Sequence, residues 1–209
     1  MNINRFSLFI VPSLLCGHAN VMHAQAEKGE QKKNVLFLIM DDMRTELNCY
    51  GAKYMKTPNM DALASQGVMF ENAYCNVPVS GASRASLFSG LRPGQTRFWD
   101  VNAEIDREAP GTVTLPQYFR ENGYVTISNS KVIHGKNDAK ERSWTEVWMP
   151  EGKSETWRDY LGDENLSVEK QRGGPEPFEC LDVADNAYFD GKTADKTMED
   201  LRRLKKSGQ

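Results

Sequence analysis

Histidine and cysteine are scarce in this chain of 209 residues, which holds three histidines and four cysteines. After residue 25 there is one histidine, His134, and three widely spaced cysteines, Cys49, Cys75 and Cys180. This scarcity excludes a histidine-rich metal centre, and the cysteines have neither zinc-ligand spacing nor the pattern of a disulfide framework. One disulfide could form among these three cysteines, and the sequence does not say which pair would form it.

Strong charge of one sign and long hydrophobic runs are also missing. The net charge of −3 creates no field that would recruit nucleic acid or an anionic membrane, so we expect neither as a partner. Any anion must therefore be bound by local groups. The longest N-terminal apolar stretch, residues 6–16, is too short for a spanning helix, which needs about 20 apolar residues.

The first residues are typical of an export signal. Arg5 precedes the short apolar stretch, and Ala-Gln-Ala at 24–26 has the small-x-small pattern of a cleavage site. We expect a signal peptide over residues 1–24, a polar linker over 25–33, and no integral membrane segment after signal removal. Two alternatives stay open, which are a buried N-terminal element and a lipoprotein modified at Cys16.

Strand-like and helix-like segments alternate along the rest of the chain. The continuous apolar run 35–40 is typical of a central parallel strand buried on both faces. Further strands are expected over 68–70 and 124–127. Helices are expected over 58–66, 83–88, 114–121 and 185–206, with a long irregular insertion over 150–185. The alternation predicts an α/β fold with a mostly parallel sheet flanked by helices.

Two carboxylates, Asp41 and Asp42, end the first apolar run. Open α/β sheets place ligand sites at the carboxyl ends of their strands. Adjacent carboxylates suit a hard cation, Ca²⁺ or Mg²⁺, because no cysteine or histidine cluster accompanies them. The alternative is a solvated turn after the strand.

A second group of polar residues follows later in the chain. Ser80 lacks a Gly-x-Ser-x-Gly elbow, which argues against a Ser-His-Asp hydrolase. Arg84 reaches the Ser80 side chain if the intervening turn is helical. Lys131 and His134 follow the third expected strand, and an imidazole that titrates near neutrality suits proton transfer. Taken singly, these residues also fit ordinary loop or surface positions.

The order of these motifs along the chain resembles that of a known protein family. Asp-Asp stands at 41–42, Ser-Gly-Ala-Ser-Arg at 80–84, Ser-Gly-Leu-Arg-Pro at 89–93 and Lys-Val-Ile-His at 131–134. From about residue 33 onward the sequence resembles the N-terminal part of type I sulfatases, and among them the iduronate-2-sulfatase branch. The resemblance implies the N-terminal portion of an alkaline-phosphatase-like sulfatase fold.

The resemblance also implies roles for individual residues. Ser80 would be oxidised to formylglycine by a serine-type formylglycine-generating enzyme of bacteria, and the hydrated aldehyde would attack sulfur. Asp41, Asp42 and Ser80 would hold the cation, Ca²⁺ or Mg²⁺. Arg84 would hold the diol and the cation-bound oxygens. By the same resemblance Lys131 would bind sulfate or diol oxygens, and His134 would act as the base that releases sulfate.

The expected function is that of a sulfuric ester hydrolase acting on a sulfated carbohydrate, such as a 2-O-sulfated uronic acid. The enzyme would be exported to the periplasm or cell surface of a bacterium. Members of the family are more than twice as long, so we expect residues 34–209 to be a sulfatase N-terminal domain that is incomplete at its C-terminus. The alternatives are a catalytically inactive fragment, and a phosphodiesterase or phosphatase of the same superfamily.

Overall fold

The computed structural model describes residues 32–152, 158–169, 171, 174 and 178–208. The signal peptide expected over 1–24, and all but the last residues of the linker expected over 25–33, lie outside the described residues. The chain divides into two units, residues 1–36 and 37–209, and the second contains every described helix and strand. None of the helices in the described part combines the length and the apolar composition needed to cross a membrane.

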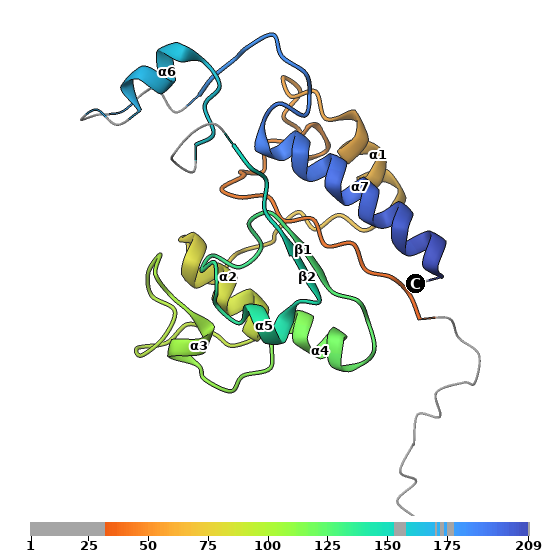
Figure 1. Ribbon diagram of the computed structural model, residues 1–209, viewed down its shortest axis with the longest axis vertical. Coiled ribbons are helices and arrows are strands. Elements are labelled where there is room, and N and C mark those ends of the chain that lie inside the picture. Colours follow the sequence, from red (N-terminus) through yellow and green to blue (C-terminus); the bar gives the residue numbers. More distant parts are fainter. Residues whose placement is uncertain (1–31, 153–157, 170, 172–173, 175–177, 209) are drawn as a thin grey trace, which may run out of the picture. The chain divides into compact units, whose positions relative to one another are not determined.

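A parallel pair of strands forms the sheet of the second unit. In this pair β1 (Ile127–Asn129) lies beside β2 (Glu146–Trp148), with Ile127 opposite Glu146. Parallel neighbours need a crossover connection, and residues 130–145 with the short helix α5 (Lys140–Ser143) supply it. The α/β character and the parallel pairing expected from the sequence are therefore confirmed (Figure 1).

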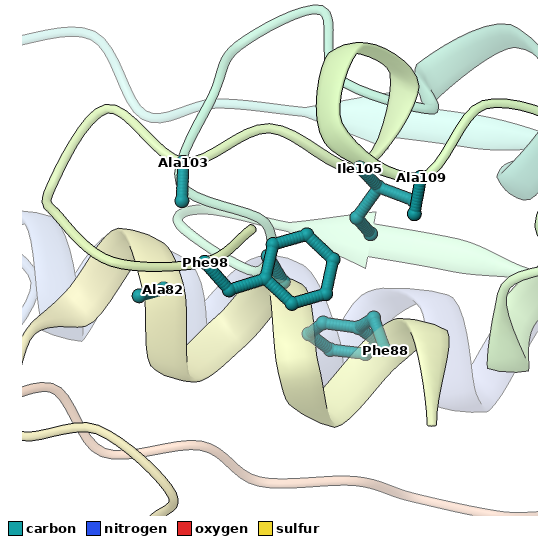
Figure 2. Packing of buried hydrophobic residues seen from close by; sticks show 7 residues of the cluster. Ala82, Phe88, Phe98, Ala103, Ile105 and Ala109 are labelled. Carbon is teal, nitrogen blue, oxygen red and sulfur yellow. The ribbon is translucent and has the colours of Figure 1, made fainter. Parts of the chain in front are cut away.

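Helix α2 (Ser80–Ser89) provides one wall of the core. Its Ala82, Ala85 and Phe88 are almost completely buried against Phe98 and Ile105 from the following segment (Figure 2). Two alanines on this face leave room for the later chain to approach the helix closely. As a result α3 (Ile105–Glu108) and the loop before it pack directly on α2.

Helix α4 (Leu115–Glu121) begins as the sequence predicts. Thr114 accepts a hydrogen bond from the backbone N–H of Gln117, and the Gln117 side chain accepts one from Thr114, which completes a capping box. The Thr114 hydroxyl also lies 2.7 Å from the hydroxyl of Ser143 at the end of α5. This buried contact joins α4 to the crossover between the strands.

Four further helices complete the described structure, and two of them match expectations. Helix α1 (Pro58–Gln66) has the expected bounds and is followed by Gly67. Helix α7 (Phe189–Ser207) replaces the expected 185–206 and contacts β1 through Asp200, which accepts a hydrogen bond from Asn129. The 3-10 helix η1 (Asn48–Tyr50) and α6 (Asp163–Val168) were not expected, and α6 lies within the segment assigned as an irregular insertion.

Two of the three expected strands are wrong. Residues 35–40 and 68–70 form no strand, and their apolar side chains are largely exposed, as with Val35 at 65% and Phe70 at 68%. A strand needs a hydrogen-bonded neighbour, and in the described part of the chain β1 and β2 are the strands that pair, apart from one isolated bridge between Gly94 and Arg97. An apolar run therefore shows a tendency to be buried, whereas a strand also requires a partner.

Two other elements are displaced from their expected bounds. The strand expected over 124–127 begins at Ile127, because the Thr126 carbonyl accepts from the N–H groups of both Thr145 and Glu146 and so interrupts the regular ladder. Helix α2 begins at Ser80 instead of at residue 83. Ser80 is thus the first helical residue and is not part of a preceding loop.

Candidate active site

The N-terminal turn of α2 brings two of the expected site residues together. Ser80 and Arg84 are four residues apart in a helix, so their side chains lie on the same face, one turn apart. Arg84 Nε donates a hydrogen bond to Ser80 Oγ at 3.2 Å. The arginine is 5% exposed, so its charge is held in place by packing as well as by hydrogen bonds.

Asp41 receives hydrogen bonds from three of the expected site residues. Its Oδ1 accepts from Ser80 Oγ at 3.1 Å and from Arg84 Nη2 at 3.0 Å, and its Oδ2 accepts from Lys131 Nζ at 2.6 Å. Partial burial raises the pKa of Asp41, but the hydrogen bonds from Lys131, Arg84 and Ser80 outweigh it and lower the pKa to about 2. Asp41 is therefore an ionised carboxylate at neutral pH.

Arg84 also joins α2 to the loop that carries Lys131. Its Nη1 donates to the carbonyl oxygens of Lys131 at 3.1 Å and Val132 at 2.7 Å. The loop leaves β1 through Ser130, a non-glycine residue with a φ of 65°. One buried guanidinium thus contacts the serine, the carboxylate and the backbone of the lysine loop.

His134 lies in the same loop and is half-buried. Burial lowers the pKa of His134, the cations of Lys131 and Arg84 lower it further, and Asp41 raises it in part. The imidazole is therefore neutral at neutral pH, which is the form that accepts a proton. Its buried Nδ1 has no hydrogen-bond partner within the described structure.

Asp42 stands apart from this hydrogen-bonded group. It has a φ of 51° and an exposed side chain, and among the described residues it makes no hydrogen bond or ion pair. The described chain contains no group of three or more histidine, cysteine or acidic side chains arranged to hold a metal ion. Asp41, Asp42 and the Ser80 hydroxyl are the oxygen donors that the sequence analysis assigned to a cation.

Gly81 is a structural requirement that the sequence analysis did not identify. A Cβ atom at this position would lie 2.0 Å from the carbonyl oxygen of Val101, so the loop before α3 crosses the first turn of α2 in van der Waals contact. The signal was present in the sequence, because glycine is an unfavourable helix residue and here it directly follows Ser80.

The chain is also similar in sequence to known proteins. A family model described as Sulfatase matches residues 33–208. Human iduronate 2-sulfatase is 33% identical over 195 residues, which cover 88% of this chain and 34% of the relative. Mouse iduronate 2-sulfatase is 44% identical over 111 residues, covering 53% of this chain and 20% of the relative. The N-acetylglucosamine-6-O-sulfatase of Bacteroides thetaiotaomicron is 33% identical over 110 residues, covering 52% and 19%. The chain spans about a third of the length of the human relative.

Proposed function

The chain belongs to the sulfatase family, and we propose that it takes part in the hydrolysis of a sulfuric ester on a sulfated carbohydrate, with Ser80 as the reacting residue. The observation that carries this proposal is the convergence of Ser80, Arg84 and Lys131 on Asp41. The similarity to iduronate 2-sulfatases supports a 2-O-sulfated uronic acid as the substrate. The N-terminal pattern of residues 1–24 supports export to the periplasm or cell surface of a bacterium.

The charges around Ser80 suit an anionic substrate. Arg84 and Lys131 carry two positive charges next to one carboxylate, and His134 adds none while it is neutral. A guanidinium and an ammonium that are fixed before the substrate arrives stabilise negative charge at little reorganisation cost. These two cations are local groups for binding an anion, which the slightly acidic chain as a whole does not attract.

The oxygen donors that the sequence assigns to a cation are of the type that a hard cation prefers. Ca²⁺ takes roughly six to eight oxygen ligands, and Mg²⁺ takes fewer in a stricter geometry. Asp41, Asp42 and the oxygen of residue 80 are the groups that would hold such an ion, so this part of the donor set fits Ca²⁺ or Mg²⁺. When bound, the cation would supply positive charge opposite the sulfate oxygens.

Residue 80 would act after oxidation by a serine-type formylglycine-generating enzyme, and the hydrated aldehyde would supply two hydroxyl groups on one carbon. The surrounding side chains orient this residue. Arg84 Nε holds the oxygen of residue 80, and the ionised Asp41 accepts a hydrogen bond from it. Lys131 would bind the sulfate, and the neutral His134 would take the proton during sulfate release.

Mass spectrometry tests the modification directly. The chain is co-expressed with a serine-type converting enzyme, and the tryptic peptide spanning residues 57–84 is analysed. We expect a mass loss of about 2 Da, which corresponds to two hydrogens, together with reactivity toward a hydrazide. Ser80→Ala should abolish both changes, whereas Ser83→Ala, the matched serine of the same peptide, should retain them. An unmodified peptide would leave the proposed mechanism without a nucleophile.

Turnover of sulfated disaccharides tests the substrate. The modified protein should release sulfate from a 2-O-sulfated uronic acid disaccharide faster than from a 6-O-sulfated one. Release that persists in Ser80→Ala would contradict the proposed role of this residue. A modified protein that releases no sulfate from either compound would favour the inactive alternative.

A further inference from the structure

The loop over residues 130–139 carries Lys131 and His134, and both of its ends are anchored. At its start, the Ser130 N–H donates to the carbonyl oxygen of Trp148 at 2.9 Å, which extends the pairing of β1 with β2. Arg84 holds the next two carbonyl groups. The entry of the loop is therefore tied to the sheet and to α2.

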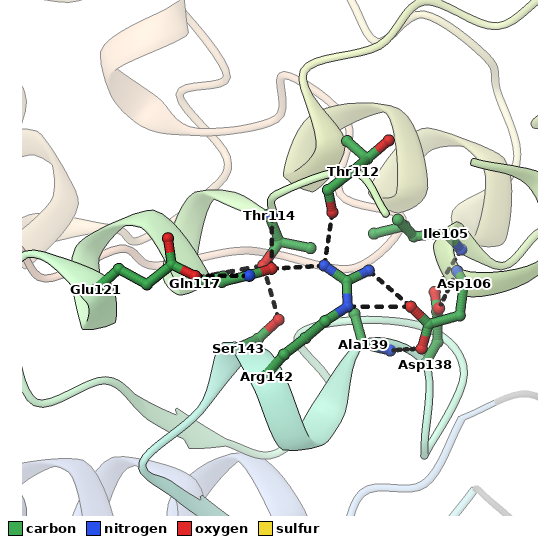
Figure 3. Close-up of polar contacts among 10 residues, drawn as sticks. All are labelled: Ile105, Asp106, Thr112, Thr114, Gln117, Glu121, Asp138, Ala139, Arg142 and Ser143. Carbon is green, nitrogen blue, oxygen red and sulfur yellow. Dashed lines mark hydrogen bonds and ion pairs between the residues drawn. The ribbon is translucent and has the colours of Figure 1, made fainter. Parts of the chain in front are cut away.

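The exit of the loop is anchored by a different group, the carboxylate of Asp138. This side chain is 6% exposed, and its two oxygens accept from the backbone N–H groups of Ile105 and Asp106, each at 2.9 Å. In return, the carboxylate of Asp106 accepts from the N–H of Ala139 at 2.8 Å. The two aspartates thus form a reciprocal clamp between α3 and the beginning of α5 (Figure 3).

Arg142 strengthens this clamp from α5. Its Nη2 lies 2.6 Å from Asp106 Oδ1, and its Nη1 donates to the Thr112 carbonyl and to Gln117 Oε1, both at 2.6 Å. The guanidinium therefore connects α3, the segment before α4 and α4 itself (Figure 3). Charged groups with several hydrogen-bond partners of this kind hold the surrounding backbone in one arrangement.

The imidazole of His134 depends on the backbone for its position. Within the described structure no hydrogen bond holds the ring, and its buried Nδ1 is without a partner. The next residue, Gly135, lies against the clamp, because a Cβ atom there would be 3.0 Å from the Cβ of Asp138. A shift of Asp138 is thus transmitted to the backbone beside the histidine.

We propose that Asp138 is a positioning residue of the candidate active site, and that its clamp with Asp106 sets the place of the His134 imidazole relative to Ser80 and Asp41. The importance of this placement for catalysis rests on the proposed function. The effect of the clamp on the position of the His134 ring does not depend on the proposed function, because it concerns only how the loop is held.

The ring resonances of His134 in an NMR spectrum of the 209-residue protein test the proposal. They are assigned by their loss in His134→Gln. In Asp138→Asn the side chain keeps its size, but one backbone N–H loses its acceptor. We expect the His134 resonances to shift and broaden, and the amides of residues 131–138 to exchange with solvent faster by on the order of tenfold.

A matched control separates positioning from a general loss of stability. Asp61 also accepts a backbone N–H, that of Cys49 at 2.9 Å, together with side-chain donors, but it lies in the η1–α1 segment. Asp61→Asn should leave the His134 resonances unchanged. Because Asp106 is 52% exposed, Asp106→Asn provides a milder second variant, and it should shift the same resonances if Asp138→Asn does not fold.

Unchanged His134 resonances in either folded clamp variant would overturn the proposal, and so would an equal shift in Asp61→Asn. Both of these NMR outcomes are distinguishable from failure of the proposed function. If formylglycine or sulfate release is absent, the proposed function fails, but the shift of the His134 resonances in the clamp variants can still be measured. If these resonances do not shift, the role of the clamp is contradicted even when the enzyme is active.

Discussion

The guanidinium of Arg84 donates to Asp41 Oδ1 at 3.0 Å, although the two residues are 43 positions apart in the sequence. The arginine side chain is 6% exposed and that of the aspartate 42% exposed, so a buried cation meets a carboxylate that still reaches solvent. Lys131 binds the same carboxylate from a more exposed position, with 37% of its side chain accessible. The two cations should therefore differ in their contributions to stability.

We expect Arg84→Met to lower the free energy of unfolding by about 2–4 kcal/mol, because the Asp41 carboxylate and two loop carbonyls lose their buried donor. Lys131→Met should cost less than about 1 kcal/mol, since its ion pair is screened by solvent. Urea unfolding of the two variants and the parent protein measures both values. Equal losses would contradict the burial of the arginine in solution.

The pKa of Asp41 predicts a loss of stability in acid. The folded-state pKa is lowered from 3.8 to about 2, so the stabilisation is fully present above the ordinary value and is lost as the pH falls through about 2. Solvent exposure of Asp41 limits the effect to below about 1 kcal/mol. Asp41→Asn should show a shallower fall in unfolding free energy between about pH 5 and pH 2.

The comparison of the two proteins isolates Asp41, because other carboxyl groups with lowered pKa values, such as Asp106 and Glu108, are present in both. Identical pH profiles would show that the hydrogen bonds to Asp41 do not persist in solution.

Gly81 should not tolerate a methyl group. In Gly81→Ala the new Cβ would meet the backbone carbonyl of Val101, so helix or loop must move, and we expect a loss of about 3 kcal/mol or more. Gly94→Ala is the matched control, because no atom lies within 4 Å of the position its Cβ would take. That variant should be neutral or stabilised by a few tenths of a kcal/mol. Thermal unfolding measures both, and similar midpoints would contradict the close approach.

The pKa of His134 should rise when Lys131 loses its charge. Burial lowers this pKa first, and Lys131 is the next cause, so Lys131→Met should move it back toward the ordinary value of 6.5. Titration of the imidazole resonances by NMR measures the change, with Lys56→Met, an exposed lysine in the segment before α1, as the control. An unchanged pKa in Lys131→Met would show that the ammonium does not face the imidazole.

Local signals in the sequence were sufficient for several helices. Helix α1 follows from Thr57-Pro58 and Gly67, and α4 follows from Thr114-Leu115-Pro116 and Gly123. These signals act over three or four residues, so they operate before distant segments meet. The strand expected over 35–40 is wrong because a strand depends on a distant partner. Apolar composition indicates burial but does not specify which segment would pair with it.

The residues of the candidate site also divide into those that local sequence motifs identify and those that only folding brings into place. The sequence motifs identified Ser80, Arg84, Lys131, His134 and Asp41, and the structure brings them into one region. Asp138 was not identified, because an aspartate that caps a distant backbone N–H has no signature in its own neighbourhood. Its partner Ile105 is 33 residues away, and only folding makes the contact.

The sequence by itself determined the spacing of four residues between Ser80 and Arg84, which places the two side chains one above the other if the turn between them is helical. The structure decided that this turn is helical, because α2 begins at Ser80 and not at residue 83. Only the tertiary structure decided that Asp41 would receive the hydrogen bond of Ser80, that Lys131 would reach the other oxygen of the same carboxylate, and that a single arginine would hold the lysine loop. Such contacts depend on burial and on the packing of segments tens of residues apart. Local backbone preference cannot encode them, because the donor and acceptor meet only after the core has formed.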